Sequence, residues 1–277
     1  MIPKRIIQTG PVDLSLRLRA GMKNVTLLNS GFEYMFFDDA QVESFVQEQC
    51  QEWRHTYQSF PFKIQRFDFF RYMAVYRFGG FYLDLDIFLA EPLEPLLSSA
   101  CVFPFEELTD SKFFWDRFQM DWQIGNYAFG AEPNHPFLAA IIDNCIRAQR
   151  DPSWVKPMMN WIPKPFYDEY YILNTSGPGL VSRTYAENPC SVETVCVTFP
   201  GDVRDPRTWH QFGTLGIHDM VGSWRNHHTI LVRPVRRVWA AWKQRRALLK
   251  SRNRGNTRET GLRETSHRAA EGMSGVM

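Results

Sequence analysis

A predicted helix over residues 64–78 is joined by two glycines to an aromatic strand of only three residues, 81–83. Glycines end a helix readily because they adopt backbone conformations that other residues avoid. The strand is followed immediately by Asp84 and Asp86. In open α/β sheets, ligands bind at the carboxyl ends of the strands. The pattern therefore predicts an α/β fold in which two carboxylates lie at a ligand-binding edge of the sheet.

The segments before and after this junction predict further elements of the same class of fold. A strand over residues 2–8, a helix over 12–22 and a strand over 32–37 give the alternation with which a parallel sheet begins. Hydrophobic periodicity and turn residues predict the other elements. These are helices over 42–57 and 136–149, strands over 127–130 and 195–199, and a basic amphipathic helix over 235–249.

Charge divides the chain into a mildly acidic body and a basic end. Residues 1–230 carry 20 Lys/Arg and 27 Asp/Glu, whereas residues 231–277 carry 12 Lys/Arg and three Glu. An acidic body excludes a nucleic-acid-binding core, which needs a basic face for the phosphates. We expect one domain over 1–230, a basic amphipathic helix over 231–250 and a polar, disordered tail over 251–277.

The basic helix has two interpretations. In the first, it packs on the domain through Trp239 and Trp242. In the second, it makes a peripheral contact with an anionic membrane, where tryptophans lie at the interface and cations pair with headgroups. The apolar residues expected on one side of the helix are Val235, Val238, Trp239, Trp242 and Leu249.

Cysteine usage and hydropathy indicate the compartment. The five cysteines are odd in number and lack a CxxC pair, so they predict neither a zinc site nor a disulfide framework. No segment approaches the ~18 apolar residues of a membrane span, and the first apolar run is too short for a signal peptide. We expect a cytoplasmic protein, located in solution or at the inner face of a membrane.

Asp84 and Asp86 flank a single residue in a segment that we expect to be extended, so their side chains should point to the same side. Two neighbouring carboxylates repel each other unless a cation neutralises them. Mg²⁺ and Mn²⁺ prefer carboxylate and phosphate oxygens. The pair therefore predicts a divalent metal site that leaves positions open for a diphosphate.

Residues 67–72 and 76–86 resemble the sugar-binding region of the Asp-x-Asp glycosyltransferases, family 32 in particular. The resemblance covers roughly residues 1–230 and is strongest over 68–95. It implies a GT-A-like nucleotide-sugar-binding domain, in which helices flank a mostly parallel central sheet. It also implies a nucleotide-sugar donor and a Mn²⁺ or Mg²⁺ cofactor.

Other segments follow the order of the same family. Residues 2–9 resemble its opening strand, although Ile7 replaces the usual histidine. Residues 126–137 resemble the segment beside the donor sugar. Residues 175–179 resemble its Thr-Gly-Pro turn, with Ser176 inserted. The closing His and Ser-Trp element is represented by His218, Ser223 and Trp224.

The resemblance implies a role for each matched position. Asp86 is the direct metal ligand, and His218 completes the metal shell. Asp84 contacts sugar or ribose hydroxyls and reaches the metal through water. The alternative for His218, Tyr82 and Trp224 is a structural role, and for Asp68 with Arg71 it is an i,i+3 surface ion pair. Asn126 and Asp121 are candidates for positioning the donor, and Asn126 is grouped with Asp84 and Asp86 as catalytic. The expected donor-binding residues are Gln8, Thr9, Asp68, Arg71, Tyr82, Asp84, Ser223 and Trp224.

The resemblance implies a retaining glycosyltransferase that moves a hexosyl group to a hydroxyl of a glycan or lipid-linked acceptor. UDP-sugars are the first expectation for the donor and GDP-mannose the second. A two-metal phosphatase or nuclease needs further acidic clusters, and a glycosidase needs carboxylates on both sides of the scissile bond. A non-catalytic nucleotide-sugar or carbohydrate-binding module is the remaining alternative.

Overall fold

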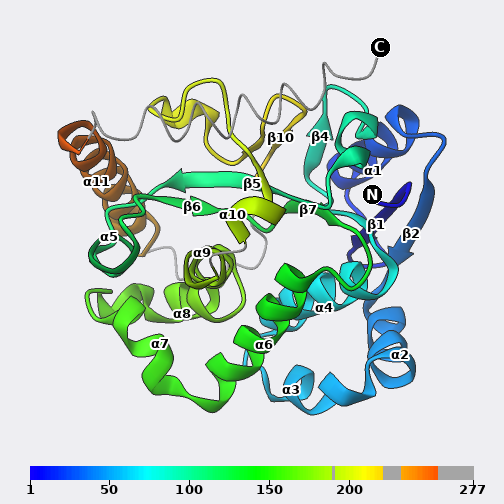
Figure 1. The fold of residues 1–277 in the computed structure, drawn as a ribbon, viewed down its shortest axis with the longest axis horizontal. Coiled ribbons are helices and arrows are strands. Elements are labelled where there is room, and N and C mark those ends of the chain that lie inside the picture. The colour runs from blue at the N-terminus through cyan, green and yellow to red at the C-terminus, as the bar shows by residue number, and fades with distance from the viewer. Residues whose placement is uncertain (189–190, 221–231, 255–277) are drawn as a thin grey trace.

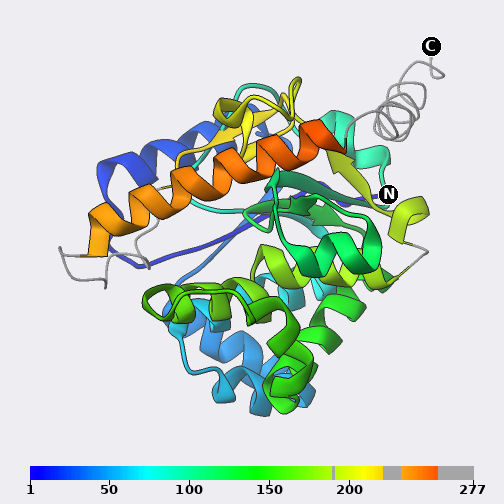
Figure 2. The same ribbon diagram turned by 90° about the vertical axis from the view of Figure 1, so that its left-hand side faces the viewer.

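The computed structural model describes residues 1–188, 191–220 and 232–254 as a sheet between two layers (Figures 1 and 2). Strand order in the seven-stranded sheet is β2-β1-β3-β7-β5-β6, and β8 also pairs with β5. All strands except β6 and β7 point the same way. The expected α/β fold with a mostly parallel sheet is therefore confirmed. The strands are β1 (Arg5–Thr9), β2 (Glu33–Phe37), β3 (Gly80–Leu83), β5 (Cys101–Leu108), β6 (Trp122–Ile124), β7 (Ala128–Ala131) and β8 (Cys196–Thr198).

Helices cover both faces of this sheet. One layer contains most of the helices, and the other contains α1, α11 and a small antiparallel sheet of β4 (Ile87–Leu89), β10 (Gly216–His218) and β9 (Gln211–Phe212) (Figures 1 and 2). The helices are α1 (Leu16–Leu28), α2 (Asp39–Gln49), α3 (Arg54–Ser59), α4 (Lys63–Phe78), α5 (Lys112–Phe118), α6 (Pro136–Arg150), α7 (Pro152–Met159), α8 (Tyr167–Thr175), α9 (Pro178–Glu187), α10 (Ser191–Thr194) and α11 (Val232–Asn253).

Alternating strand residues build a separate apolar core on each face of the sheet. Successive side chains of a strand point to opposite faces. Ile7 and Tyr82 accordingly pack into the core shared with α4, α6 and α9, whereas Ile6, Phe81 and Leu83 pack into the core shared with α1 and β4. Strands β3 and β7 are thus buried on both faces along their whole length, which explains why neither contains a charged residue.

Two predicted helices have different bounds in the structure. The helix expected over 42–57 is broken, because α2 ends at Gln49 and the buried Cys50 turns the chain before α3 begins. Burial of Cys50 in the main core outweighs the continuous helical pattern of the sequence. The helix expected over 12–22 begins later, where Ser15 caps its first turn.

Helix α11 docks on the domain with a face that differs from the predicted one. Trp239 packs on Phe166 and Trp161, with ring centroids 5.6 and 6.0 Å apart, so packing of this tryptophan is confirmed. Trp242 stacks on Trp239 but stays 42% exposed. The expected apolar side is therefore not the docking side, because Val235, Val238 and Leu249 are also exposed. Basic side chains fill much of the docking face instead.

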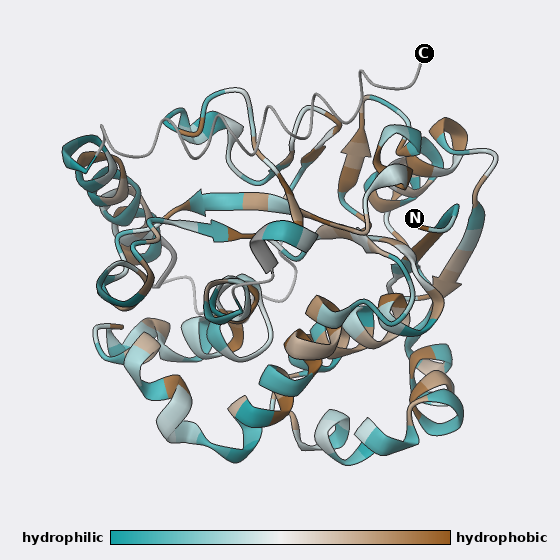
Figure 3. Ribbon diagram, in the orientation of Figure 1, coloured by the Kyte–Doolittle hydropathy of each residue, from teal (hydrophilic) through white to brown (hydrophobic). Residues whose placement is uncertain are grey.

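Hydropathy differs sharply between the interior strands and this helix. In Figure 3, strand β4 is hydrophobic along its length, whereas α11 is mainly hydrophilic. None of the helices within the described residues is long and apolar enough to cross a membrane. The division of the chain at residues 230 and 250 stays a prediction, and α11 extends slightly past the second boundary.

Gly79 and Gly80 form the junction between α4 and β3, with φ angles of +63° and +97°. A Cβ added at Gly80 would lie 2.6 Å from the carbonyl oxygen of Arg5, on the neighbouring strand β1. Both the backbone conformation and this close approach therefore require glycine.

We predict that Gly80→Ala lowers the free energy of unfolding by roughly 2 kcal/mol or more, because strain and a backbone clash combine. Urea denaturation followed by circular dichroism measures the change. Gly31→Ala is the matched control, since a Cβ there meets no atom within 4 Å. Equal stability of the two variants would contradict this account of the junction.

Candidate functional site

Asp84 and Asp86 lie in a tight turn that links the two sheets. Strand β3 ends at Leu83, and the amide of Ile87 donates to the carbonyl of Asp84 at 3.1 Å. The expectation of an extended segment over 84–86 is thus wrong. The chain turns here because β4 leaves the large sheet to pair with β10.

Hydrogen bonds to the neighbouring segments hold the backbone of this turn. The side-chain amide of Gln8 donates to the carbonyls of Leu83 and Asp84, at 3.2 and 3.3 Å. The hydroxyl of Tyr34 donates to the side-chain oxygen of Gln8, Oε1, at 2.9 Å. The amide of Asp84 donates to the carbonyl of Tyr127 at 2.7 Å. The turn is therefore fixed by Gln8 of β1, which Tyr34 of β2 holds in place, and by Tyr127 just before β7.

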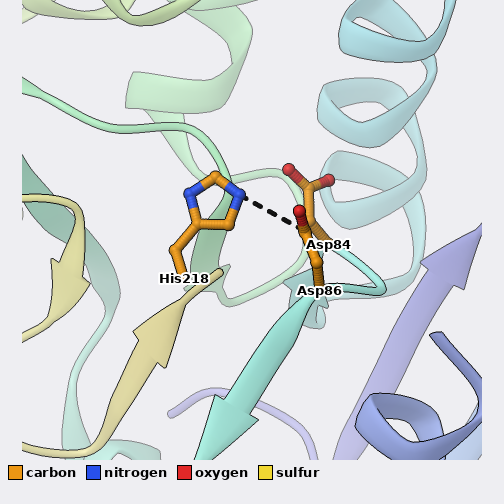
Figure 4. A group of neighbouring side chains, drawn as sticks. All are labelled: Asp84, Asp86 and His218. Atoms are coloured by element: carbon orange, nitrogen blue, oxygen red, sulfur yellow. Dashed lines mark ion pairs between the residues drawn. The ribbon is translucent and has the colours of Figure 1, made fainter. Parts of the chain in front are cut away.

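Asp84, Asp86 and His218 converge despite the turn (Figure 4). One potential ligand atom from each lies within 4.8 Å of the others, and the His218 Nε2 to Asp86 Oδ1 distance is 3.2 Å. Strand β10 places His218 beside Ile87, directly after the turn. The His218 ring stacks on Tyr127, with centroids 4.5 Å apart. Residues 132 positions apart in sequence thus meet at one edge of the fold.

The donor set of this cluster fits a hard divalent cation. Two carboxylates and one imidazole match the ligands that Mn²⁺ accepts, and two adjacent carboxylates need positive charge close by. Burial raises the pKa of Asp84, Arg71 opposes that rise, and the charge of Asp86 adds to it. A cation at the cluster would relieve the repulsion between Asp84 and Asp86.

Behind Asp84, the guanidinium of Arg71 lies between two carboxylates. Its Nη1 is 3.3 Å from Asp84 Oδ1, and its Nη2 is 3.2 Å from Asp68 Oδ1. The side chains of Arg71 and Asp68 are only 6% and 7% exposed, so the pair is not at the surface. Burial alone would lower the pKa of Arg71, but Asp84, Tyr82 and Asp68 together hold it above its ordinary value. Arg71 therefore stays charged.

Asp68 is held by hydrogen bonds on both oxygens. Asn126 Nδ2 donates to Oδ1 at 3.1 Å, and the hydroxyl of Ser176 donates to Oδ2 at 2.7 Å. Burial raises the pKa of Asp68, while Arg71 and Ser176 oppose this shift. The amide of Asn126 also donates to the hydroxyl of Tyr72 at 2.8 Å. This set of residues forms a buried polar network behind the Asp84 turn.

The remaining predicted site residues have mixed positions. Tyr82 is buried, donates its hydroxyl to Asp84 Oδ1 at 2.9 Å and stacks on Arg71 at 4.6 Å. The hydroxyl of Thr9 donates to the carbonyl of Phe37 at 2.8 Å. Ser223 and Trp224 lie outside the described residues. Their donor-binding roles, and that of Gln8, stay predictions.

Sequence reasoning missed Tyr72, Tyr127 and the contact of Ser176. Tyr72 follows Arg71 in α4 and donates its hydroxyl to the carbonyl of Ser176 at 2.6 Å. The one signal in the sequence for the Ser176 contact is its insertion into the predicted turn. An extra hydroxyl requires a hydrogen-bond partner if that turn is buried. No sequence pattern indicated that Tyr127 would lie under His218.

We predict that Ser176→Ala lowers the free energy of unfolding by about 1–3 kcal/mol, because it removes a hydrogen bond from a buried carboxylate. Thermal or urea unfolding measures this change. Ser153→Ala is the matched control, since Ser153 is exposed and its hydroxyl also contacts an aspartate, Asp151. A Ser176→Ala protein as stable as the control would show that the network does not depend on this bond.

Residues 16–103 match the family described as "Glycosyltransferase sugar-binding region containing DXD motif". The chain is 34% identical over 116 residues to inositol phosphoceramide mannosyltransferase 1 of Schizosaccharomyces pombe, which covers 42% of this chain and 32% of that protein. It is 24% identical over 188 residues to the mannosyl phosphorylinositol ceramide synthase CSH1 of Saccharomyces cerevisiae, covering 68% and 43%. The chain thus spans less than half the length of these relatives.

Among solved structures, the PaToxG glycosyltransferase aligns with a TM-score of 0.48 at 11% identity, covering 69% of this chain and 72% of that one. Residues 16–103, which match the sugar-binding region, include the whole of α4, β3 and the turn with Asp84 and Asp86. His218, Asn126 and Ser176 lie outside them. Over residues 16–103 the chain is therefore similar to the glycosyltransferases whose sugar-binding region contains the DXD motif.

Proposed function

We propose that the chain is a retaining glycosyltransferase that moves a hexosyl group from a nucleotide-sugar to a hydroxyl of a glycan or lipid-linked acceptor. The observation that carries the proposal is the convergence of Asp84, Asp86 and His218 in front of the charged Arg71. Arg71, Asp84 and Asp86 lie within the segment matched to the sugar-binding region, whereas His218 lies outside it. The arrangement supports a site for a ligand that carries both hydroxyls and a diphosphate.

Each residue of the site has a distinct task in this proposal. Asp86 and His218 hold the metal, and Asp84, whose side chain is 24% exposed, accepts hydrogen bonds from sugar or ribose hydroxyls. Arg71 and Tyr82 fix the orientation of the Asp84 carboxylate from behind. A bound Mn²⁺ or Mg²⁺ supplies positive charge that stabilises the departing diphosphate.

Asn126 acts in this proposal by positioning rather than by forming a bond to the sugar. Its backbone carbonyl accepts from Arg71 Nη1 at 2.9 Å. Its side-chain nitrogen, Nδ2, donates to Asp68 and to the hydroxyl of Tyr72. An amide in such contacts is a poor nucleophile. For a retaining enzyme, this favours transfer on the front face of the sugar, assisted by the leaving phosphate, over a covalent glycosyl–enzyme intermediate.

The names of the relatives support a mannosyl donor and a lipid-linked acceptor. Both curated relatives are named for mannosyl transfer, and their names specify inositol phosphoceramide or its mannosylated product. GDP-mannose, the second expectation from the sequence, therefore becomes a donor to test beside UDP-sugars. A lipid with a polyhydroxylated headgroup becomes the acceptor class of choice.

We predict that Asp86→Asn lowers metal-dependent hydrolysis of the donor by roughly 100-fold or more, because the anionic metal ligand is lost. Release of nucleoside diphosphate in a Mn²⁺ titration measures the rate, and calorimetry measures Mn²⁺ binding independently. Asp116→Asn, the same change at an exposed residue of α5, is the matched control. Wild-type rates and Mn²⁺ affinity in the Asp86→Asn protein would refute the assignment of the metal.

We predict that the correct nucleotide-sugar, with Mn²⁺, raises the melting temperature by about 5 °C at a hundredfold excess over its dissociation constant, because it binds only the folded state. A thermal-shift screen of UDP-sugars and GDP-mannose identifies the donor. Stabilisation without product from any glycan or lipid-linked acceptor would favour a binding module. No stabilisation by any nucleotide-sugar would count against the proposed function.

A further inference from the structure

Helix α11 presents two different faces, and the inner one is fully engaged with the domain. Arg236 pairs with Glu169 at 2.7 Å, Arg246 with Asp110 at 3.0 Å, and the Lys250 ammonium donates to the Asp110 carbonyl at 3.0 Å. Lys243 lies 3.9 Å from Glu107 and 4.7 Å from the centre of the Tyr170 ring. The cations of the inner face thus dock the helix on the domain.

The outer face carries a regular stripe, which we call the outer stripe. Its members follow one another at intervals of three and four residues, the spacing that aligns side chains on one face of a helix. Its apolar members are 42% to 71% exposed. The outer stripe consists of Val235, Val238, Trp242, Arg245, Leu249 and Arg252.

Charge restricts what can bind the outer stripe. Helix α11 contains eight Lys/Arg residues and no acidic residue. Arg237, Arg245 and Arg252 are exposed, so they are available to an anionic partner. A second copy of the chain would bring the same arginines against each other, and juxtaposed like charges disfavour such an interface. Apolar side chains interleaved with arginines instead match an anionic lipid surface, where a helix lies in the plane of the headgroups.

We propose that the outer stripe attaches the protein to the surface of an anionic membrane, while the inner face of α11 fixes the domain to the helix. Trp242 and the three aliphatic side chains enter the headgroup region, and the arginines pair with lipid phosphates or carboxylates. This attachment would bring the donor site to the surface where a lipid-linked acceptor lies. Its role in the reaction therefore rests on the proposed function.

Co-sedimentation with vesicles tests this directly on the full chain, without donor or metal. We expect binding to vesicles of 70% phosphatidylcholine and 30% phosphatidylserine, and little binding to pure phosphatidylcholine. Because one cation near such a surface contributes about a fivefold factor, Arg245→Gln with Arg252→Gln should lower the partition coefficient roughly 25-fold. The difference should shrink in high salt.

A second pair of variants tests the apolar part of the stripe. Val235→Ser, Val238→Ser and Trp242→Ser together should lower vesicle binding at least tenfold. The matched control replaces Val12, Leu16 and Leu27 by Ser, three exposed apolar residues elsewhere, and should bind like the wild type. Circular dichroism establishes that each variant is folded.

Three results would overturn the attachment proposal. These are wild-type protein that stays in the supernatant, equal binding to neutral and anionic vesicles, or a dimer in light scattering that the stripe variants abolish while vesicle binding is absent. Donor hydrolysis, measured without vesicles, should be equal in all variants and reports only on the proposed function. If the wild-type protein hydrolyses the donor but does not bind vesicles, the attachment proposal fails. If it binds vesicles but does not hydrolyse the donor, the proposed function fails.

Discussion

The site depends on one buried cation, the guanidinium of Arg71. Three acidic side chains, Asp68, Asp84 and Asp86, lie close together at the end of one strand and the facing helix, and such a group is unstable without positive charge. Arg71 contacts two of them and is nearly inaccessible to water, so its interactions are weakly screened. It therefore offsets part of the repulsion permanently, while Asp86 lies 3.2 Å from Nε2 of His218.

The arginine can do this only because the surrounding backbone is fixed. Helix α4 supplies Asp68 and Arg71 one turn apart, and the glycine junction then leads the chain back under them as β3. The side chains of Gln8 and Tyr34 hold the turn that follows. The small sheet adds His218 from a distant part of the chain. The site thus lies where the large sheet ends and the small sheet begins.

The sequence predicts much of this arrangement, for identifiable reasons. Periodicity located α4 almost to the residue, and the glycines located its end, because both signals are local. The resemblance predicted that His218 and Asp86 share a site. No local pattern could predict this pairing, because the two residues are 132 positions apart. The turn at 84–86 was predicted wrongly, since pairing of β4 with β10 decides it. The break of the predicted helix at Cys50 has the same origin, because it depends on burial in the tertiary structure.

The charged inner face of α11 has a consequence for any shortened form of the protein. Asp110 is 2% exposed at its side chain, and its partner Arg246 comes from this helix. A chain cut before residue 232 would retain Asp110 and Glu169 but lose the cations that face them, and uncompensated buried acids destabilise a fold. The helix is therefore an integral part of the domain's electrostatic balance. A loss of activity after its removal would reflect a weakened fold as readily as a lost membrane contact.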